Sequence, residues 1–120
     1  MEIATRLSNE IARFLDLDTR QIQLTSDNMA NVDTPGYRTL GFNFEGEMRL
    51  AISQVDSEGD AVSPRIVTVD GLIERPDGNN VSMDREGLNL AEAQLRFKTG
   101  VALLRREYTR IFDAIHADGK

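Results

Sequence analysis

Apolar side chains recur at helical spacing over the first third of the chain. They stand three, four or seven residues apart, at Ile3, Leu7, Ile11, Phe14, Leu15, Ile22, Met29 and Val32. This spacing places them on one face of a helix, and no proline or glycine precedes Pro35. We therefore predict one helix over about residues 2–32, roughly 45 Å long at 1.5 Å per residue. Its weak point is the Asp-Leu-Asp-Thr run at 16–19, because Asp and Thr are unfavourable inside helices.

The last third of the chain has the most regular pattern. Two series with seven-residue spacing interleave in steps of four and three, namely Leu90, Phe97, Leu104, Ile111 and Gln94, Val101, Tyr108, Ile115. Steps of four and three are typical of a coiled-coil seam. Ser82 or Asp84 can cap the helix that carries it. Gly87 and Gly100 each cost about 1 kcal/mol relative to alanine, so we expect this helix to need a packing partner.

The segment between the two helices is rich in turn residues and contains all three prolines. Asp70-Gly71 separates two β-prone runs, 65–69 and 72–74, which predicts a β-hairpin across this dipeptide. Residues 56–60 are expected to form an exposed loop. Apolar residues of the preceding stretch are expected to cover one side of the hairpin: Phe42, Phe44, Met48, Leu50 and Ile52.

These patterns predict a mainly α fold. Two long terminal helices form an antiparallel coiled-coil-like hairpin, with a small β-hairpin-containing insert between them. The predicted regions are an N-terminal helix (1–34), a turn and insert (35–81) and a C-terminal helix (82–120). At 120 residues the chain is one domain overall.

Composition argues against several classes of partner. The net charge is −6, and basic residues do not cluster beyond Arg105-Arg106, which disfavours nucleic acid and anionic membranes. Cysteine is absent, so disulfides and thiolate metal sites are excluded. No apolar run approaches the roughly 18 residues that membrane insertion needs. The first residues lack the pattern of a cleaved secretory signal, so we expect any export to proceed without one.

Candidate catalytic chemistry is sparse. His116 is the only histidine, and near a helix C-terminus it fits the helix dipole. Asp56, Glu58 and Asp60 alternate like calcium ligands but lack the spaced downstream glutamate. Glycine-rich phosphate motifs are absent. We therefore expect no enzyme activity, no cofactor and no metal.

A compact motif follows the first predicted helix, at residues 28–38 (N-M-A-N-V-D-T-P-G-Y-R). Pro35 disfavours helical geometry at Thr34. Pro35-Gly36 suits the central positions of a type II turn, where Gly36 supplies a positive φ. Tyr37 then provides an aromatic anchor.

The motif resembles the N-terminal signature of bacterial flagellar rod and hook proteins, and most resembles the proximal rod proteins. The matching positions are Asn28, Asn31, Thr34, Pro35, Gly36 and Tyr37. A second block at 78–86 (G-N-N-V-S-M-D-R-E) and a third at 91–97 resemble the same family. The resemblance covers about residues 1–50 and 78–117. Phe97 departs from it, because the family usually has tyrosine there.

The resemblance implies a structural subunit of the basal-body rod in the periplasm. Such proteins are exported unfolded by the flagellar type III apparatus, and their terminal helices pack together on assembly. Implied partners are other proximal rod proteins, the rod-to-ring adaptor protein, the export apparatus and further copies of the chain. The expected subunit-interface residues are seam positions: Leu7, Ile11, Phe14, Ile22, Leu90, Phe97, Val101, Leu104, Tyr108 and Ile111. Phe44 and Met48 fit an F-x-x-x-apolar pattern for contact with the export gate, although Phe44 also suits simple packing.

Two alternatives stay open. The seams also suit packing of the two helices within one chain and nothing further. A soluble cytoplasmic coiled-coil adaptor or export chaperone would show the same heptad pattern. Resistance of the termini to protease in the isolated chain would favour that adaptor.

Overall fold

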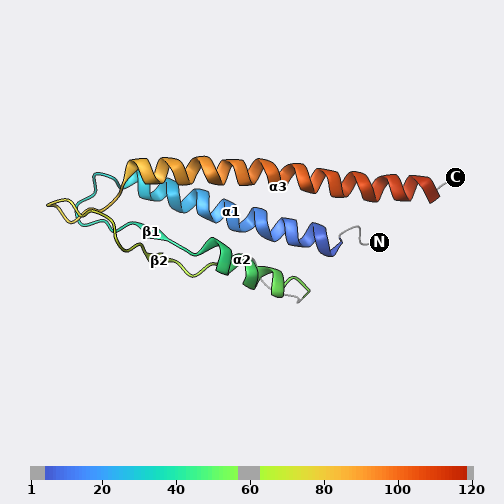
Figure 1. Cartoon of the computed structure of the whole chain (residues 1–120), viewed down its shortest axis with the longest axis horizontal. Coiled ribbons are helices and arrows are strands. Elements are labelled where there is room, and N and C mark those ends of the chain that lie inside the picture. The colour runs from blue at the N-terminus through green and yellow to red at the C-terminus, as the bar shows by residue number, and fades with distance from the viewer. Residues whose placement is uncertain (1–4, 57–62, 119–120) are drawn as a thin grey trace.

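The computed structural model describes residues 5–56 and 63–118 and has extents of 70 × 26 × 18 Å (Figure 1). Helices α1 (Arg6–Ala30) and α3 (Met83–Asp118) run antiparallel along its length. A shorter helix, α2 (Phe44–Ser53), and the strands β1 (Leu40–Gly41) and β2 (Val67–Thr68) form the insert, which packs on α1. The mainly α fold with a small antiparallel sheet is thereby confirmed.

Side-chain caps define where the long helices begin. Thr5 Oγ1 accepts from the Ser8 N–H at 3.0 Å and Ser8 Oγ accepts from the Thr5 N–H at 2.8 Å, a reciprocal capping box. Ser82 Oγ accepts from the Arg85 N–H at 3.3 Å at the start of α3, which confirms Ser82 of the two predicted caps. Ile3 of the predicted apolar face lies outside the described residues.

The predicted β-hairpin across Asp70-Gly71 is wrong. β2 pairs instead with β1, with Leu40 opposite Thr68 and Gly41 opposite Val67, and residues 72–74 form no strand. Gly71 does turn the chain, with φ of 82°. However, the N–H of Val69 donates to the Thr39 carbonyl at 2.9 Å, so this β-prone run takes its partner from the segment after α1. Of the predicted loop at 56–60, Asp56 is exposed and 57–60 lie outside the described residues.

The apolar stretch expected to cover the hairpin is instead the helix α2. Asn43 caps it, since its Oδ1 accepts from the Gly46 N–H at 3.1 Å. Phe44 lies edge-on to Phe14 of α1, with ring centroids 5.7 Å apart. Ala51 is buried at the other end of the helix. Packing against α1 therefore accompanies a short helix in a segment that the sequence predicted only as apolar cover for the hairpin.

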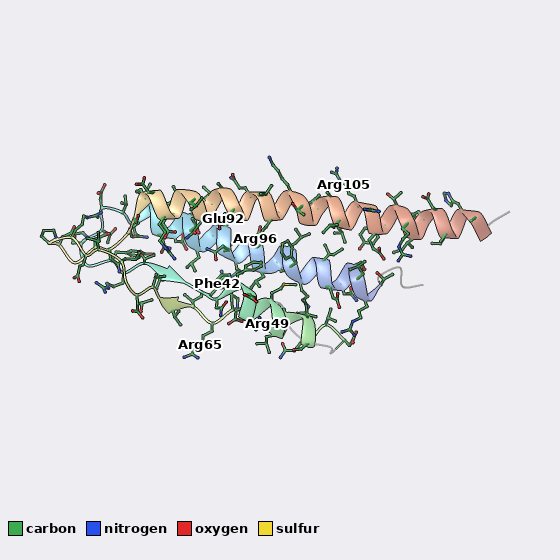
Figure 2. The ribbon with its side chains drawn as sticks, viewed as in Figure 1. Phe42, Arg49, Arg65, Glu92, Arg96 and Arg105 are labelled. Atoms are coloured by element: carbon green, nitrogen blue, oxygen red, sulfur yellow. The ribbon has the colours of Figure 1, made fainter. Side chains whose placement is uncertain are left out.

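The expected weak point of α1 is the place where three helices meet. Leu17 and Asp18 are both 0% exposed. Asp18 Oδ1 accepts from Arg96 Nε of α3 at 3.0 Å, and the Arg96 guanidinium lies 4.6 Å from the ring centre of Phe44 in α2. Figure 2 shows Arg96 on the side of α3 that faces α1. Burial raises the pKa of Asp18 against the opposing effect of Arg96. Asp18 is unfavourable for helix formation, but its ion pair joins α1 to α3 in the core.

Candidate functional site

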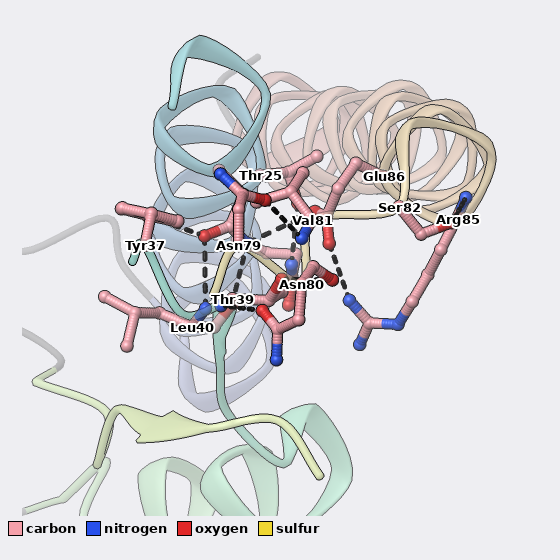
Figure 3. Close-up of polar contacts among 12 residues, drawn as sticks. Thr25, Tyr37, Thr39, Leu40, Asn79, Asn80, Val81, Ser82, Arg85 and Glu86 are labelled. Carbon is pink, nitrogen blue, oxygen red and sulfur yellow. Dashed lines mark hydrogen bonds and ion pairs between the residues drawn. The ribbon is translucent and has the colours of Figure 1, made fainter. Parts of the chain in front are cut away.

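The motif after α1 and the block before α3 meet at the end of the helical hairpin, and we call residues 28–40 and 75–86 together the corner (Figure 3). The turn forms as predicted. The Tyr37 N–H donates to the Thr34 carbonyl at 3.2 Å, and Gly36 has φ of 75°, as the third position of a type II turn requires.

Asn28 is the centre of the corner and is 1% exposed. Its Nδ2 donates to the Leu40 carbonyl at 2.8 Å and to Glu86 Oε2 at 3.3 Å. Its Oδ1 accepts from the Leu40 N–H at 3.1 Å and from the Tyr37 hydroxyl at 2.8 Å. Burial raises the pKa of Tyr37, so this hydroxyl keeps the proton it donates. One amide therefore joins α1, β1 and α3.

Two further asparagines complete the corner from the other block. Asn79 is 0% exposed, and its Nδ2 donates to the carbonyls of Asn31 at 2.9 Å and Thr34 at 2.8 Å. These carbonyls belong to the end of α1 and the turn, where no helical partner remains. Asn80 Oδ1 accepts from the buried Thr39 N–H at 2.7 Å. The second block thus supplies hydrogen bonds that the first block lacks.

Glycines let the two turns approach each other closely. The Gly36 N–H donates to the Asp77 carbonyl at 2.8 Å. Gly78 has φ of 87°, and a Cβ on it would lie 3.3 Å from Gly36 Cα. A side chain at Gly78 would therefore be strained by its φ and crowded by the facing turn.

The hydrogen bonds of the corner fix the positions of the chain segments that meet there. Its buried carboxylate, Glu86, is engaged by Arg85 at 2.6 Å as well as by Asn28. Among the described residues, no three His, Cys, Asp or Glu side chains are placed to hold a metal ion. Breaking one of the corner's hydrogen bonds leaves a buried polar group unpaired, which costs about 1–3 kcal/mol.

From the corner onward, α3 packs on α1 through a seven-residue series that the apolar pattern missed. Its members are all buried: Glu86, Ala93, Gly100 and Glu107. A Cβ on Gly100 would lie 2.6 Å from Leu15 and 3.1 Å from Phe14. Small and acidic residues do not register in a search for apolar periodicity. Their spacing was the only signal that could have found them.

Glu107 is the last member of this series and lies beside the start of α1. It accepts from the Thr5 hydroxyl at 3.0 Å and from Arg110 Nη2 at 2.7 Å. Hydrogen bonding by Arg110, with a smaller contribution from Thr5, lowers the pKa of Glu107. Since α1 begins level with Glu107, residues 108–118 of α3 extend about 16 Å beyond it.

The structure distributes the predicted interface residues over different environments. Ile11 is buried, and Phe14 packs on α2 and α3. Leu7, Phe97 and Tyr108 remain 49%, 38% and 37% exposed. The others are partly buried: Ile22, Leu90, Val101, Leu104 and Ile111.

Leu7 and Ile11 also line a groove of about 620 Å³ between α1 and α3, together with Leu103 and Glu107. The two predicted export-gate residues belong to α2. Phe44 packs on Phe14 of α1, and Met48 is partly buried. No helix within the described ranges is apolar enough over a sufficient length to cross a bilayer.

No protein-family model matches the chain. Individual curated proteins do match it. Three of these relatives are described as flagellar basal body rod protein FlgB. The protein from Cereibacter sphaeroides is 31% identical over 111 residues, covering 84% of this chain and 86% of the relative. Those of Yersinia enterocolitica and Salmonella typhimurium are 29% and 27% identical, covering 75% and 87% of this chain and 79% and 86% of the relatives.

Proposed function

The chain belongs to the FlgB family of flagellar basal body rod proteins, and we propose that it is a non-catalytic subunit that self-assembles into the rod through α1 and α3. We further propose that it reaches the periplasmic rod through the flagellar type III apparatus, without a cleaved signal. The proposed partners are other proximal rod proteins, the rod-to-ring adaptor protein and the export apparatus.

One observation carries the assembly proposal, namely the apolar surface that α3 leaves uncovered. Leu88 and Leu95 are 61% and 66% exposed, and Phe112 and Ile115 are 48% and 45% exposed. Single exposed apolar residues are ordinary, but two such pairs on one helix, the second on the part of α3 that extends beyond α1, favour an interaction surface. The ten interface residues predicted from the sequence are proposed as contacts on the same two helices.

The composition of the α1–α3 seam supports export of an unfolded chain. Polar contacts interrupt the apolar packing between the two helices, namely Asp18–Arg96, Thr5–Glu107 and Asn28–Glu86. A buried ion pair such as Asp18–Arg96 contributes less stability than apolar packing of similar volume, which suits a hairpin that opens reversibly. Phe44 and Met48 remain proposed export-gate contacts that act in the unfolded chain.

The corner offers the first test. Gly36→Val should abolish rod assembly with little effect on expression, because valine resists a φ of 75°. Gly36→Asn is the matched control, since asparagine tolerates positive φ. Normal motility with Gly36→Val would overturn the role given to the turn.

The seam offers the second test. Leu104→Asp should block incorporation into rods, whereas Ala102→Asp places the same charge on an exposed position of α3 and should be tolerated. Wild-type rods containing Leu104→Asp would refute the seam as an assembly surface. Limited proteolysis of the isolated chain separates the adaptor alternative, which requires protease-resistant termini.

A further inference from the structure

Two charged and apolar stripes occupy different parts of α3. The acidic stripe consists of Asp84, Leu88, Glu92 and Leu95, in steps of four, four and three. The basic stripe consists of Lys98, Val101, Arg105 and Tyr108, in steps of three, four and three. Each set of steps keeps its members on one side of a helix.

Both stripes are open to solvent except at Val101, which is partly buried. Leu88 and Leu95 are 61% and 66% exposed, and Tyr108 is 37% exposed. The charged members are exposed, and Arg105 points away from α1 (Figure 2). Within the part of the chain that the structure describes, Asp84, Glu92, Lys98 and Arg105 form no ion pair.

The stripes cannot contact each other in one molecule, because they lie on the same continuous helix and face different directions. Val101 follows Leu88 by thirteen residues, a rotation of about 140° from its direction at about 100° per residue. Any contact between an acidic and a basic stripe is therefore a contact between two molecules.

The two stripes match each other in order and spacing. A displacement of thirteen residues superposes Val101 on Leu88, Arg105 on Glu92 and Tyr108 on Leu95. It also places Lys98 within one residue of Asp84. Each base then faces an acid and each apolar residue faces a leucine, which is electrostatic and apolar complementarity in one register.

We infer that the basic stripe of one copy docks on the acidic stripe of a second copy, with parallel α3 helices displaced by about 20 Å at 1.5 Å per residue. The inference rests on the proposed rod function and names its contact. Because the two surfaces differ, two docked copies still present one free stripe of each kind, the acidic stripe on one copy and the basic stripe on the other. Such heterologous contacts build an open-ended assembly and do not close into a dimer.

Charge reversal tests the pairing in cells that lack their own copy. Glu92→Arg and Arg105→Glu should each remove the chain from purified basal bodies and abolish swimming. The double variant E92R/R105E should restore both, because the pair re-forms between copies with its charges exchanged. Arg106→Glu is the matched control, since it changes the adjacent exposed base, which belongs to neither stripe. A double variant as defective as the single variants, or an equal defect with Arg106→Glu, would overturn the inference.

Cross-linking tests the register and uses the absence of native cysteine. Leu95→Cys combined with Tyr108→Cys in one chain should give a ladder of disulfide-linked copies in oxidised basal bodies. Each single variant should give none. Dimers from Tyr108→Cys alone would indicate a self-complementary contact, and a disulfide to a different protein would indicate another occupant. Either result would overturn the inference.

Purified basal bodies from cells with the wild-type chain separate a failure of the proposed rod function from a failure of the stripe pairing. If the wild-type chain is absent from basal bodies, the proposed rod function fails. If it is present, but neither charge rescue nor a ladder appears, only the stripe pairing fails.

Discussion

Gly87 and Gly100 are both helical glycines of α3, but they lie in opposite environments. A Cβ on Gly87 would have no neighbour within 4 Å. On Gly100 it would lie 2.6 Å from Leu15 Cδ2 and within 3.1–3.2 Å of two atoms of the Phe14 ring. Replacing each glycine by alanine therefore applies the same propensity change at one open site and one packed site.

The two substitutions should change the free energy of unfolding in opposite directions. Gly87→Ala should stabilise the protein by about 1 kcal/mol, the propensity difference in a helix. Gly100→Ala gains the same amount but overpacks the seam, which typically costs about 1–3 kcal/mol. The end of Leu15 can move aside, whereas the Phe14 ring is held against Phe44. We expect a net loss of about 1 kcal/mol at Gly100.

Thermal unfolding followed by far-ultraviolet circular dichroism measures the difference. For a chain of this length, 1 kcal/mol corresponds to about 4 °C in Tm. The two variants should then differ by about 8 °C, with wild type between them. A rise in Tm with Gly100→Ala as large as that with Gly87→Ala would refute the close approach of α1 and α3 at this point.

Three further outcomes follow from the polar contacts. Asn28→Ala should lower the free energy of unfolding by about 3 kcal/mol in urea titrations, because it leaves the buried groups around it unpaired, whereas the exposed Asn9→Ala should not. The raised pKa of Asp18 means that the native state holds this proton more tightly than the unfolded state. Wild type should therefore gain stability relative to Asp18→Asn as pH falls from neutral toward the ordinary value of 3.8, and parallel stability curves would contradict this. The lowered pKa of Glu107 changes stability with pH in the opposite direction. Its contribution is complete above the ordinary value of 4.5 and is lost as pH falls through the lower native value, so the advantage of wild type over Glu107→Gln should shrink in acid.

The long helices were predictable because they depend on local spacing. Apolar residues at steps of three and four, with no interior proline, placed α1 and α3 to within a few residues of their observed ends. Pro35-Gly36 likewise predicted the turn, because its conformational preferences act within the dipeptide.

The insert was less predictable, because its short elements depend on distant partners. No helix was predicted over residues 44–53, yet contact of Phe44 with Phe14 accompanies one. Asp70-Gly71 turns the chain without pairing the runs beside it, because Thr39 accepts the N–H of Val69. A two-residue strand has too few hydrogen bonds to select its partner from local preference.

The sequence alone therefore determined the two helices, the turn between them and the presence of a family motif, since each rests on the chemistry of neighbouring residues. Only the tertiary structure decided what the motif does. Asn28 and Asn79 lie 51 positions apart in the sequence, yet Asn28 bonds Glu86 of the second block and Asn79 bonds the Asn31 and Thr34 carbonyls of the first. The structure also decided which heptad series faces α1. The buried series is Glu86, Ala93, Gly100 and Glu107. Small residues allow the two helices to approach closely, and the acidic residues form hydrogen bonds between them. Much of the apolar surface of α3 is therefore left facing outward.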